Sequence, residues 1–345
     1  RHALTLAGRA LGQVAPNPAV GCVIVRDGVV VGRGWTQKGG RPHAETMALR
    51  EAGEGARGAA AYVTLEPCAH HGQTPPCANA LIEAGIARVV AAIEDPDPRV
   101  AGKGFAMLRA ANVDVTADVL KDEAAELNAG FFLRLKENRP LVTLKIAESA
   151  DGFIAKPSGE SKWITGEDAR RFAHLLRARH DAILVGIGTV LADDPELTCR
   201  LPGLEDRSPM RVVLDTHLRL SPQSKLAQTA HQIPTLVFTA AEGGEALQKL
   251  GVEIVRTSTD PQGRPDAHAV LAELARRGLT RLLVEGGAMV HAGFDKWADR
   301  LEIFRGPANL GVGLRSAVNP QLNRFTHVAT RCLGPDLLES YIAKA

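Results

Sequence analysis

"EPCAHHGQTPPC", residues 66–77, sets two cysteines nine positions apart in a short loop with two histidines and three prolines. Upstream, the stretch "RPHAETMAL" has His43 at the point where apolar spacing predicts the start of a helix. One imidazole and two thiolates form a donor set that Zn²⁺ prefers, so His43, Cys68 and Cys77 are the predicted metal ligands. Three protein ligands leave the fourth tetrahedral position to water, which indicates a catalytic metal.

The reaction expected of such a site is hydrolysis by a metal-activated water. A bound Zn²⁺ lowers the pKa of its water to about 7, so zinc hydroxide is available at neutral pH. Deamination also needs a carboxylate that takes the water proton and delivers it to the ring nitrogen and the departing amine, and Glu45 is the predicted carrier. The pattern H-x-E followed by P-C-x-x-C is typical of zinc nucleobase deaminases, and here eight residues separate the cysteines.

Two other interpretations of this loop stay open. His70 or His71 could complete a four-ligand structural zinc site, and without metal the cysteines would be two buried apolar side chains. The catalytic interpretation carries a geometric condition. Residues two apart on a regular helix point in nearly opposite directions, so His43 and Glu45 can share a site only if the helix begins at about Ala44.

Composition and charge indicate a soluble globular protein of 345 residues, 45% of them hydrophobic, with a formal charge of +2. A near-neutral chain offers little attraction for long nucleic acid or an anionic membrane, so we expect small anionic ligands and neither of those partners. The sequence shows no signal peptide and no run of eighteen apolar residues, and its five cysteines are scattered. We therefore expect a cytoplasmic protein with reduced thiols. A homo-oligomer is compatible with this composition.

Strand-like and helical segments alternate along the chain, which predicts an α/β fold with a mostly parallel sheet covered by helices on both faces. The turn Asp27-Gly28 joins two strands, and one helix is predicted over residues 122–137. Pro140 follows that helix, so we expect two domains, residues 1–139 and 140–345. The other expected elements of the first domain are helices at 43–53, 77–85 and 103–111 and strands at 59–65 and 87–93. The expected strands of the second domain lie at 141–147, 182–187, 211–215, 235–240, 252–257 and 281–286.

The second domain carries two weaker signals for a ligand. One is the run "RLLVEGGAMVHAGF", in which Gly286 and Gly287 separate a strand from a helix whose free N–H groups favour a diphosphate. Its spacing is not that of the dinucleotide fingerprint, and glycine pairs also simply end strands. The other is the charged cluster of Asp193, Asp194 and Arg200 after an apolar strand, where an open α/β sheet binds ligands.

Short stretches in both domains are distinctive: "PNPAVGCVIV", "PHAE", "YVTLEPCAHHGQTPPC", "DPDPRVAGKG", "GESKWIT" and "VLADDPELT". Together they resemble the family of bifunctional riboflavin-biosynthesis deaminase/reductases. The resemblance implies an N-terminal cytidine-deaminase-like α/β/α domain and a C-terminal dihydrofolate-reductase-like α/β domain that uses NADPH. It also implies deamination of 2,5-diamino-6-ribosylamino-4(3H)-pyrimidinone 5′-phosphate. Reduction of the ribosyl side chain of 5-amino-6-(5-phosphoribosylamino)uracil to ribityl would follow.

Position by position, the resemblance implies the same zinc ligands and the same role for Glu45. It adds Asn17 and His70 as substrate contacts of the deaminase, with a turn asparagine and a surface histidine as the alternatives. The implied substrate contacts of the reductase are Ser161, Arg177, Leu197, Arg200 and Glu285, with Lys145 near the reducing centre. The implied NADPH contacts are Ala147, Trp163, Thr189, Asp193, Thr216, Gly287, Ala288, Met289, Val290, His291, Ala292 and Gly293.

Some of these assignments have plain structural alternatives. Arg177 and Arg200 suit a ribose phosphate, but Arg177 could equally lie on a solvated helix face. Lys145 could be an edge-strand lysine. The segment 299–318 departs from the family pattern, so we expect that wall of the reductase to have drifted or its edge to pair differently. The alternative function is a single-function zinc nucleobase deaminase with a C-terminal binding module.

Overall fold

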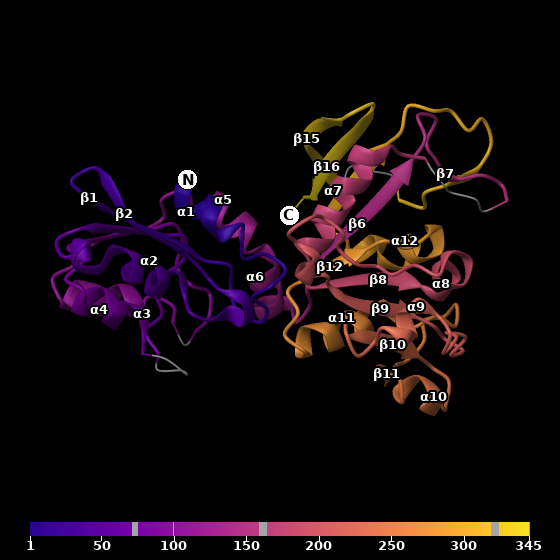
Figure 1. Ribbon diagram of the computed structural model, residues 1–345, viewed down its shortest axis with the longest axis horizontal. Helices are drawn as coiled ribbons and strands as arrows, with labels where there is room; N and C mark the ends of the chain where they lie inside the picture. Colours follow the sequence, from indigo (N-terminus) through magenta and orange to yellow (C-terminus); the bar gives the residue numbers. More distant parts are fainter. Residues whose placement is uncertain (71–74, 99, 159–163, 319–323, 345) are drawn as a thin grey trace. The chain divides into compact units, whose positions relative to one another are not determined.

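The computed structural model describes residues 1–70, 75–98, 100–158, 164–318 and 324–344. The chain forms two compact units, Arg1–Arg139 and Pro140–Ala345 (Figure 1). Within the described ranges, no helix is both long enough and apolar enough to cross a membrane.

A five-stranded sheet in the order β2-β1-β3-β4-β5 forms the centre of the N-terminal unit. Its strands are β1 (Gly21–Arg26), β2 (Val29–Trp35), β3 (Ala60–Val63), β4 (Arg88–Ala91) and β5 (Asp114–Thr116). β1 pairs antiparallel with both β2 and β3, whereas β3, β4 and β5 are parallel to one another. The sheet is thus mixed, and the prediction of a mostly parallel sheet holds only for β3, β4 and β5. The two-residue turn at Asp27-Gly28 accounts for the antiparallel pair of β1 and β2, because so short a connection joins only antiparallel strands.

Helices cover both faces of this sheet. α2 (Ala44–Ala52), α3 (Cys77–Glu83) and α4 (Lys103–Ala110) share one hydrophobic core with it. α1 (His2–Ala7) packs on the other face, against Val23 of β1.

The predicted helix over residues 122–137 is in fact two helices, α5 (Lys121–Leu127) and α6 (Ala129–Glu137). Asn128 separates them. Its buried side-chain amide accepts a hydrogen bond from the Ala19 N–H and donates one to the Ala19 carbonyl. The break is set by a partner more than a hundred residues away, which the local pattern does not contain.

Two glycines let α2 lie directly on β2. A Cβ at Gly32 would lie 2.2 Å from the carbonyl oxygen of Ala48, and a Cβ at Gly34 would lie 2.1 Å from that of Ala44. The helix begins at Ala44, which confirms the prediction, and His43 before it is extended, with φ −70° and ψ 161°. The strand therefore determines the position of the first turn of α2.

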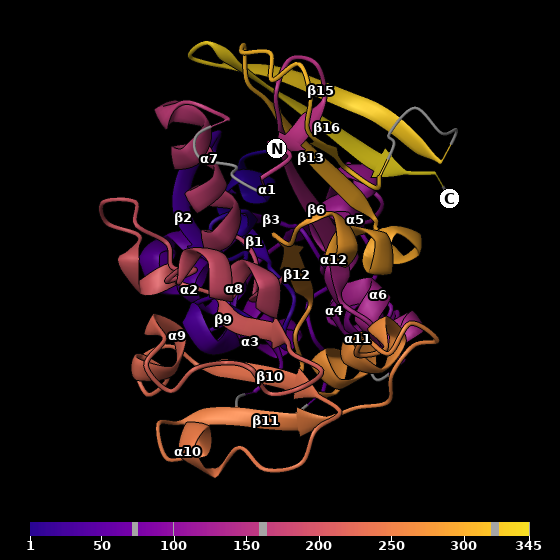
Figure 2. The same ribbon diagram turned by 90° about the vertical axis from the view of Figure 1, so that its right-hand side faces the viewer.

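A nine-stranded sheet in the order β11-β10-β9-β8-β12-β6-β13-β16-β15 forms the centre of the C-terminal unit (Figure 2). The strands from β11 to β13 in that order are parallel, and the hairpin of β16 and β15 adds antiparallel pairing at one edge. The six strands predicted for this domain are all present. They are β6 (Leu141–Glu148), β8 (Ala182–Gly186), β9 (Met210–Leu214), β10 (Thr235–Thr239), β11 (Val252–Arg256) and β12 (Arg281–Val284). The strands not predicted are β13 (Arg300–Arg305), β15 (Phe325–Leu333) and β16 (Asp336–Ala343), with β7 (Phe153–Ala155) and β14 (Leu314–Arg315) in a separate pair.

Helices also cover both faces of the larger sheet. They are α7 (Glu167–Ala178), α8 (Ile187–Asp193), α9 (Lys225–Gln228), α10 (Glu245–Gln248), α11 (Ala267–Arg276) and α12 (Ala288–Phe294). Alternate residues of β12 point to opposite faces, as in any strand. Leu282 and Val284 share a core with α11 and α12, whereas Leu283 packs with α7.

The C-terminal strands decide one interpretation of the sequence and leave another as a prediction. Within the atypical segment 299–318, Arg300–Arg305 forms a strand that pairs with β6 on one side and β16 on the other, and a difference of this wall from the family pattern stays a prediction. β6 therefore lies between β12 and β13, and the interpretation of Lys145 as an edge lysine is wrong.

Gly34→Ala is expected to lower the free energy of unfolding of the N-terminal unit by about 1–3 kcal/mol, because the added methyl group would overlap the α2 backbone. Urea unfolding followed by circular dichroism measures this loss. Gly55→Ala is the matched control, since its Cβ would meet Val31 at 3.5 Å, an ordinary contact. Equal stability of the two variants would contradict the close approach of α2 and β2.

Candidate zinc site and reductase site

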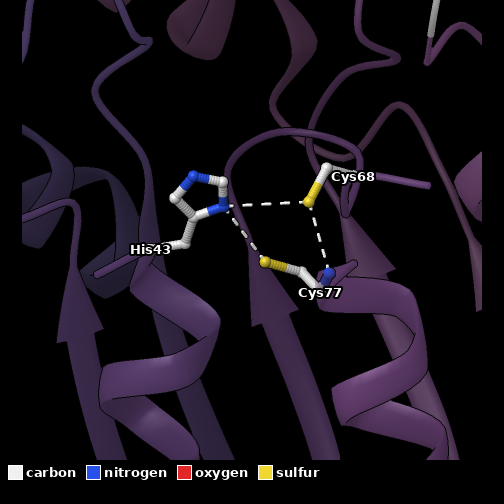
Figure 3. A group of neighbouring side chains, drawn as sticks. All are labelled: His43, Cys68 and Cys77. Carbon is white, nitrogen blue, oxygen red and sulfur yellow. Dashed lines mark hydrogen bonds between the residues drawn. The ribbon is translucent and has the colours of Figure 1, made fainter. Parts of the chain in front are cut away.

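Three side chains from separate segments meet at one point of the N-terminal unit (Figure 3). His43 immediately precedes α2, Cys68 lies in the loop after β3, and Cys77 is the first residue of α3. His43 Nδ1 lies 3.2 Å from Cys77 Sγ and 3.7 Å from Cys68 Sγ. All three ligand atoms lie within 4.8 Å of one another. The structure thus brings together the three ligands predicted from the sequence.

The donor set and its spacing fit a tetrahedral zinc ion. A sulfur atom about 2.3 Å and a nitrogen atom about 2.1 Å from the same tetrahedral ion lie about 3.6 Å apart. In the described part of the chain, no fourth His, Cys, Asp or Glu joins the group, so His70 is not placed as a ligand. His71 lies outside the described residues. A tetrahedral ion on these three donors would have a fourth position to which no described residue contributes a ligand.

Hydrogen bonds within the group favour an anionic Cys68. The Cys77 side chain, and then the His43 ring, lower the pKa of Cys68 to about 4 in spite of burial. The Cys77 backbone N–H also donates to Cys68 Sγ at 3.2 Å. Cys68 in turn raises the pKa of His43, and together with burial it raises the pKa of Cys77 well above its usual range. Thiolate is the form in which cysteine binds a metal.

Glu45 lies beside these ligands in the first turn of α2 and is only 4% exposed. Burial, with the charge of Cys68 adding to it, raises the pKa of Glu45 to about 7. Glu45 in turn contributes to the raised pKa of Cys77. With its own pKa at about 7, the Glu45 carboxyl group can both take up and release a proton at neutral pH. By contrast, burial raises the pKa of the Cys22 thiol well above its usual range, which makes that cysteine unreactive.

Asn17 and His70, the two residues predicted to contact the deaminase substrate, differ in their surroundings. A Cβ at Gly40 would lie 1.9 Å from Asn17 Nδ2, so the Asn17 amide packs on the backbone three residues before His43. His70 is half-buried, and in the described structure its Nδ1 atom has no hydrogen-bond partner. Their contacts with substrate stay predictions.

Two buried carboxylates near Cys68 were missed from the sequence. Glu66 is 3% exposed and Asp95 is 7% exposed. Burial raises the pKa of Asp95 to about 6, and the charges of Asp97, Glu66 and Cys68 add to the effect. The sequence indicated only a turn-rich loop at residues 95–104. In that loop, acidic residues alternate with prolines, which was the available signal for a functional carboxylate. Local composition, however, does not predict that such a side chain is buried.

In the C-terminal unit, an ion-paired group joins α7, the end of β12 and β6. The Arg177 guanidinium donates to both carboxylate oxygens of Glu285, from Nε at 2.8 Å and from Nη2 at 2.9 Å. Lys145 Nζ lies 4.0 Å from the same carboxylate. Burial alone would raise the pKa of Glu285, but the charges of Arg177 and Lys145 hold it at about 2. Burial lowers the pKa of Lys145, and Glu285 offsets part of that effect.

These contacts settle whether Arg177 lies on a solvated helix face, and the surroundings of Arg177 and Leu197 restrict how either residue could contact substrate. The Arg177 side chain is only 14% exposed, so its interpretation as a solvated helix face is wrong. Its third nitrogen, Nη1, donates to the Thr198 carbonyl, and all three nitrogens are thus engaged within the protein. Leu197 is 3% exposed and its side chain lies in a hydrophobic core, so a substrate contact there would come from its backbone. Arg200 is exposed, beside Glu196 and Thr198.

The implied cofactor positions lie near the carboxyl ends of parallel strands, which meet at one edge of the sheet. Thr189 and Asp193 are in α8 after β8, Thr216 follows β9, and Gly287–Gly293 leads into and forms most of α12 after β12. Within that last run Met289 is 74% exposed, whereas His291 is 2% exposed and faces the core. Ser161 and Trp163 lie outside the described residues. The contacts with cofactor stay predictions.

His43→Ala is expected to remove zinc from the purified protein, because two thiolates alone do not hold the ion. The loss of affinity should exceed the roughly 10–100-fold that loss of an outer-shell partner costs. Metal analysis after dialysis against a weak chelator measures it. His70→Ala is the control and should keep its zinc. Full zinc content in His43→Ala would show that the ligand set is wrong.

Residues 1–93 match the family model of the cytidine and deoxycytidylate deaminase zinc-binding region, and residues 140–338 match that of the RibD C-terminal domain. The riboflavin biosynthesis protein RibD of Aquifex aeolicus is 43% identical over 90% of this chain and 87% of its own length. The structure of Acinetobacter baumannii RibD has 38% identity and a TM-score of 0.88, covering 100% of this chain and 97% of that one.

A further solved structure, from Thermotoga maritima, is described as a diaminohydroxyphosphoribosylaminopyrimidine deaminase/5-amino-6-(5-phosphoribosylamino)uracil reductase. It has 36% identity and a TM-score of 0.88, and the match covers 99% of this chain and 97% of that one. The expected pair of a cytidine-deaminase-like and a dihydrofolate-reductase-like domain is confirmed, and a single-function deaminase with a binding module is excluded. The chain belongs to the RibD family of bifunctional deaminase/reductases of riboflavin biosynthesis.

Proposed function

We propose that the N-terminal unit deaminates 2,5-diamino-6-ribosylamino-4(3H)-pyrimidinone 5′-phosphate. The C-terminal unit then reduces the ribosyl chain of 5-amino-6-(5-phosphoribosylamino)uracil with NADPH. The observation that carries this proposal is the group of His43, Cys68 and Cys77 with Glu45 buried beside it. The name of the Thermotoga maritima relative supports the choice of substrates.

Deamination divides the work between the metal ligands and Glu45. A zinc ion held by His43, Cys68 and Cys77 supplies an acidified water at neutral pH. Glu45 takes one proton from that water and passes it to the ring nitrogen, while the hydroxide oxygen bonds to the amine-bearing carbon. Glu45 then takes the second proton from the hydroxyl group now on that carbon and gives it to the amine; the carbon–nitrogen bond breaks as the carbonyl forms, and ammonia leaves. The raised pKa of Glu45 suits it to take up and release a proton in each of these transfers.

Glu45→Gln is expected to slow ammonia release from the phosphorylated diaminopyrimidinone by about 10²–10⁴-fold, the usual contribution of a general acid–base group. Zinc content should stay unchanged because Glu45 is not a ligand. Glu54→Gln, an exposed carboxylate after α2, is the control and should keep full activity. Full deaminase activity in Glu45→Gln would remove Glu45 from the mechanism.

For the reductase, we propose NADPH at the carboxyl ends of β8, β9 and β12, with the substrate phosphate near Arg200. NADPH supplies a hydride to C1′ of the ribosyl group. As that C–H bond forms, the bond from C1′ to the ring oxygen breaks, and the oxygen needs a proton. Lys145 is the proposed donor, since its half-buried side chain places the ammonium group beside Glu285 and has a lowered pKa.

Lys145→Met is expected to slow the reduction by about 10²–10⁴-fold and to leave deamination unchanged. Both steps can be followed in one cuvette, with ammonia release first and NADPH oxidation after the cofactor is added. The exposed Lys249, changed to Met, is the control for loss of a lysine in the same unit. NADPH oxidation at the wild-type rate in Lys145→Met would exclude Lys145 as the proton donor.

We also propose a cytoplasmic location, because Cys68 and Cys77 must stay reduced to bind zinc. Assembly into a homo-oligomer stays a prediction.

A further inference from the structure

Glu66, two positions before the zinc ligand Cys68, has a hydrogen-bonding pattern that the reaction does not explain. Its carboxylate is buried and accepts hydrogen bonds from four backbone N–H groups. Oε2 accepts from Gly102 at 2.9 Å and Asp95 at 3.3 Å, and Oε1 accepts from Gly104 at 2.8 Å and Phe105 at 3.2 Å. One side chain thus satisfies donors from two separate segments.

Three of those donors belong to the start of α4, which has no cap of its own. Gly102 is the residue that precedes the helix, and it has no side chain to accept from the first turn. The first N–H groups of a helix need outside acceptors and favour a negative charge. Glu66, in the loop that carries Cys68, supplies both the acceptor oxygens and the negative charge. The loop and α4 are therefore joined through a charged, buried contact.

A second contact presses the same two segments together. A Cβ at Gly104 would lie 1.9 Å from the Pro67 carbonyl oxygen, so the first turn of α4 lies directly on the peptide before Cys68. On its other side, Cys68 is held by α3: its carbonyl accepts from the Ala78 N–H at 3.2 Å, and its sulfur accepts from the Cys77 N–H at 3.2 Å. Cys68 is thus fixed between α4 and α3.

We propose that Glu66 is a positioning residue for the zinc site: by binding the start of α4 it holds the Pro67-Cys68 backbone where the thiolate can meet His43 and Cys77. The carboxylate itself does not contact metal or substrate. Metal ligands depend on such outer-shell partners, and their loss costs roughly 10–100-fold in metal affinity.

Glu66→Gln tests this. An amide keeps the size of the side chain but replaces one acceptor oxygen with an NH₂ group, which would face two backbone donors. We expect zinc affinity, measured by competition with a chromophoric chelator, to fall by about 10–100-fold. The cobalt-substituted protein should show a weakened thiolate-to-cobalt charge-transfer band. NADPH-dependent reduction by the second unit should be unchanged and reports that the C-terminal unit is folded, while limited proteolysis reports on the N-terminal unit. Glu83→Gln, an exposed carboxylate on α3, is the matched control.

The possible results separate the proposals. Zinc affinity and a cobalt spectrum equal to wild type in Glu66→Gln would overturn the positioning role while leaving the zinc site intact. Absence of zinc binding in the wild type would instead overturn the site itself. If proteolysis shows that Glu66→Gln unfolds the N-terminal unit, the same measurements on Glu66→Asp decide. Its shorter carboxylate keeps the charge but cannot reach both sets of donors, so unchanged zinc affinity there would also overturn the proposal.

Discussion

The meeting of one imidazole nitrogen and two sulfur atoms is the constraint around which the N-terminal unit is arranged. Each donor arrives on a different segment, and each segment is fixed by backbone contact. Glycines of β2 bring α2 against the sheet just after His43, and Gly104 brings α4 against the peptide before Cys68. Backbone contacts of this kind have little freedom to relax. They suit a site whose donors must be held within about 0.5 Å of the productive geometry.

The two units use buried carboxyl groups in opposite ways. Burial raises the pKa of Glu45 to about 7, so that this group can exchange a proton near neutrality. Glu285 is also buried, but Arg177 and Lys145 hold its pKa at about 2, so it stays charged and keeps two cations in place. The side-chain chemistry is the same, and the neighbouring charges decide whether the group carries protons or positions other residues.

The parts of this account that the sequence predicted rest on residue type and short spacing. The ligand set followed from the chemistry of His43, Cys68 and Cys77, and the start of α2 at Ala44 followed from helix geometry. The parts that it did not predict depend on contacts between distant residues. Asn128 breaks a helix because it binds Ala19, and Arg177 is buried because it meets Glu285 from 108 positions away.

Zinc K-edge X-ray absorption of the wild-type protein loaded with one equivalent of metal tests directly whether the site is open and has three protein ligands. We expect two sulfur neighbours at about 2.3 Å and two nitrogen or oxygen neighbours at about 2.0–2.1 Å, of which one is an imidazole. A third sulfur, or a second imidazole in place of the light solvent ligand, would show a closed structural site and contradict this expectation.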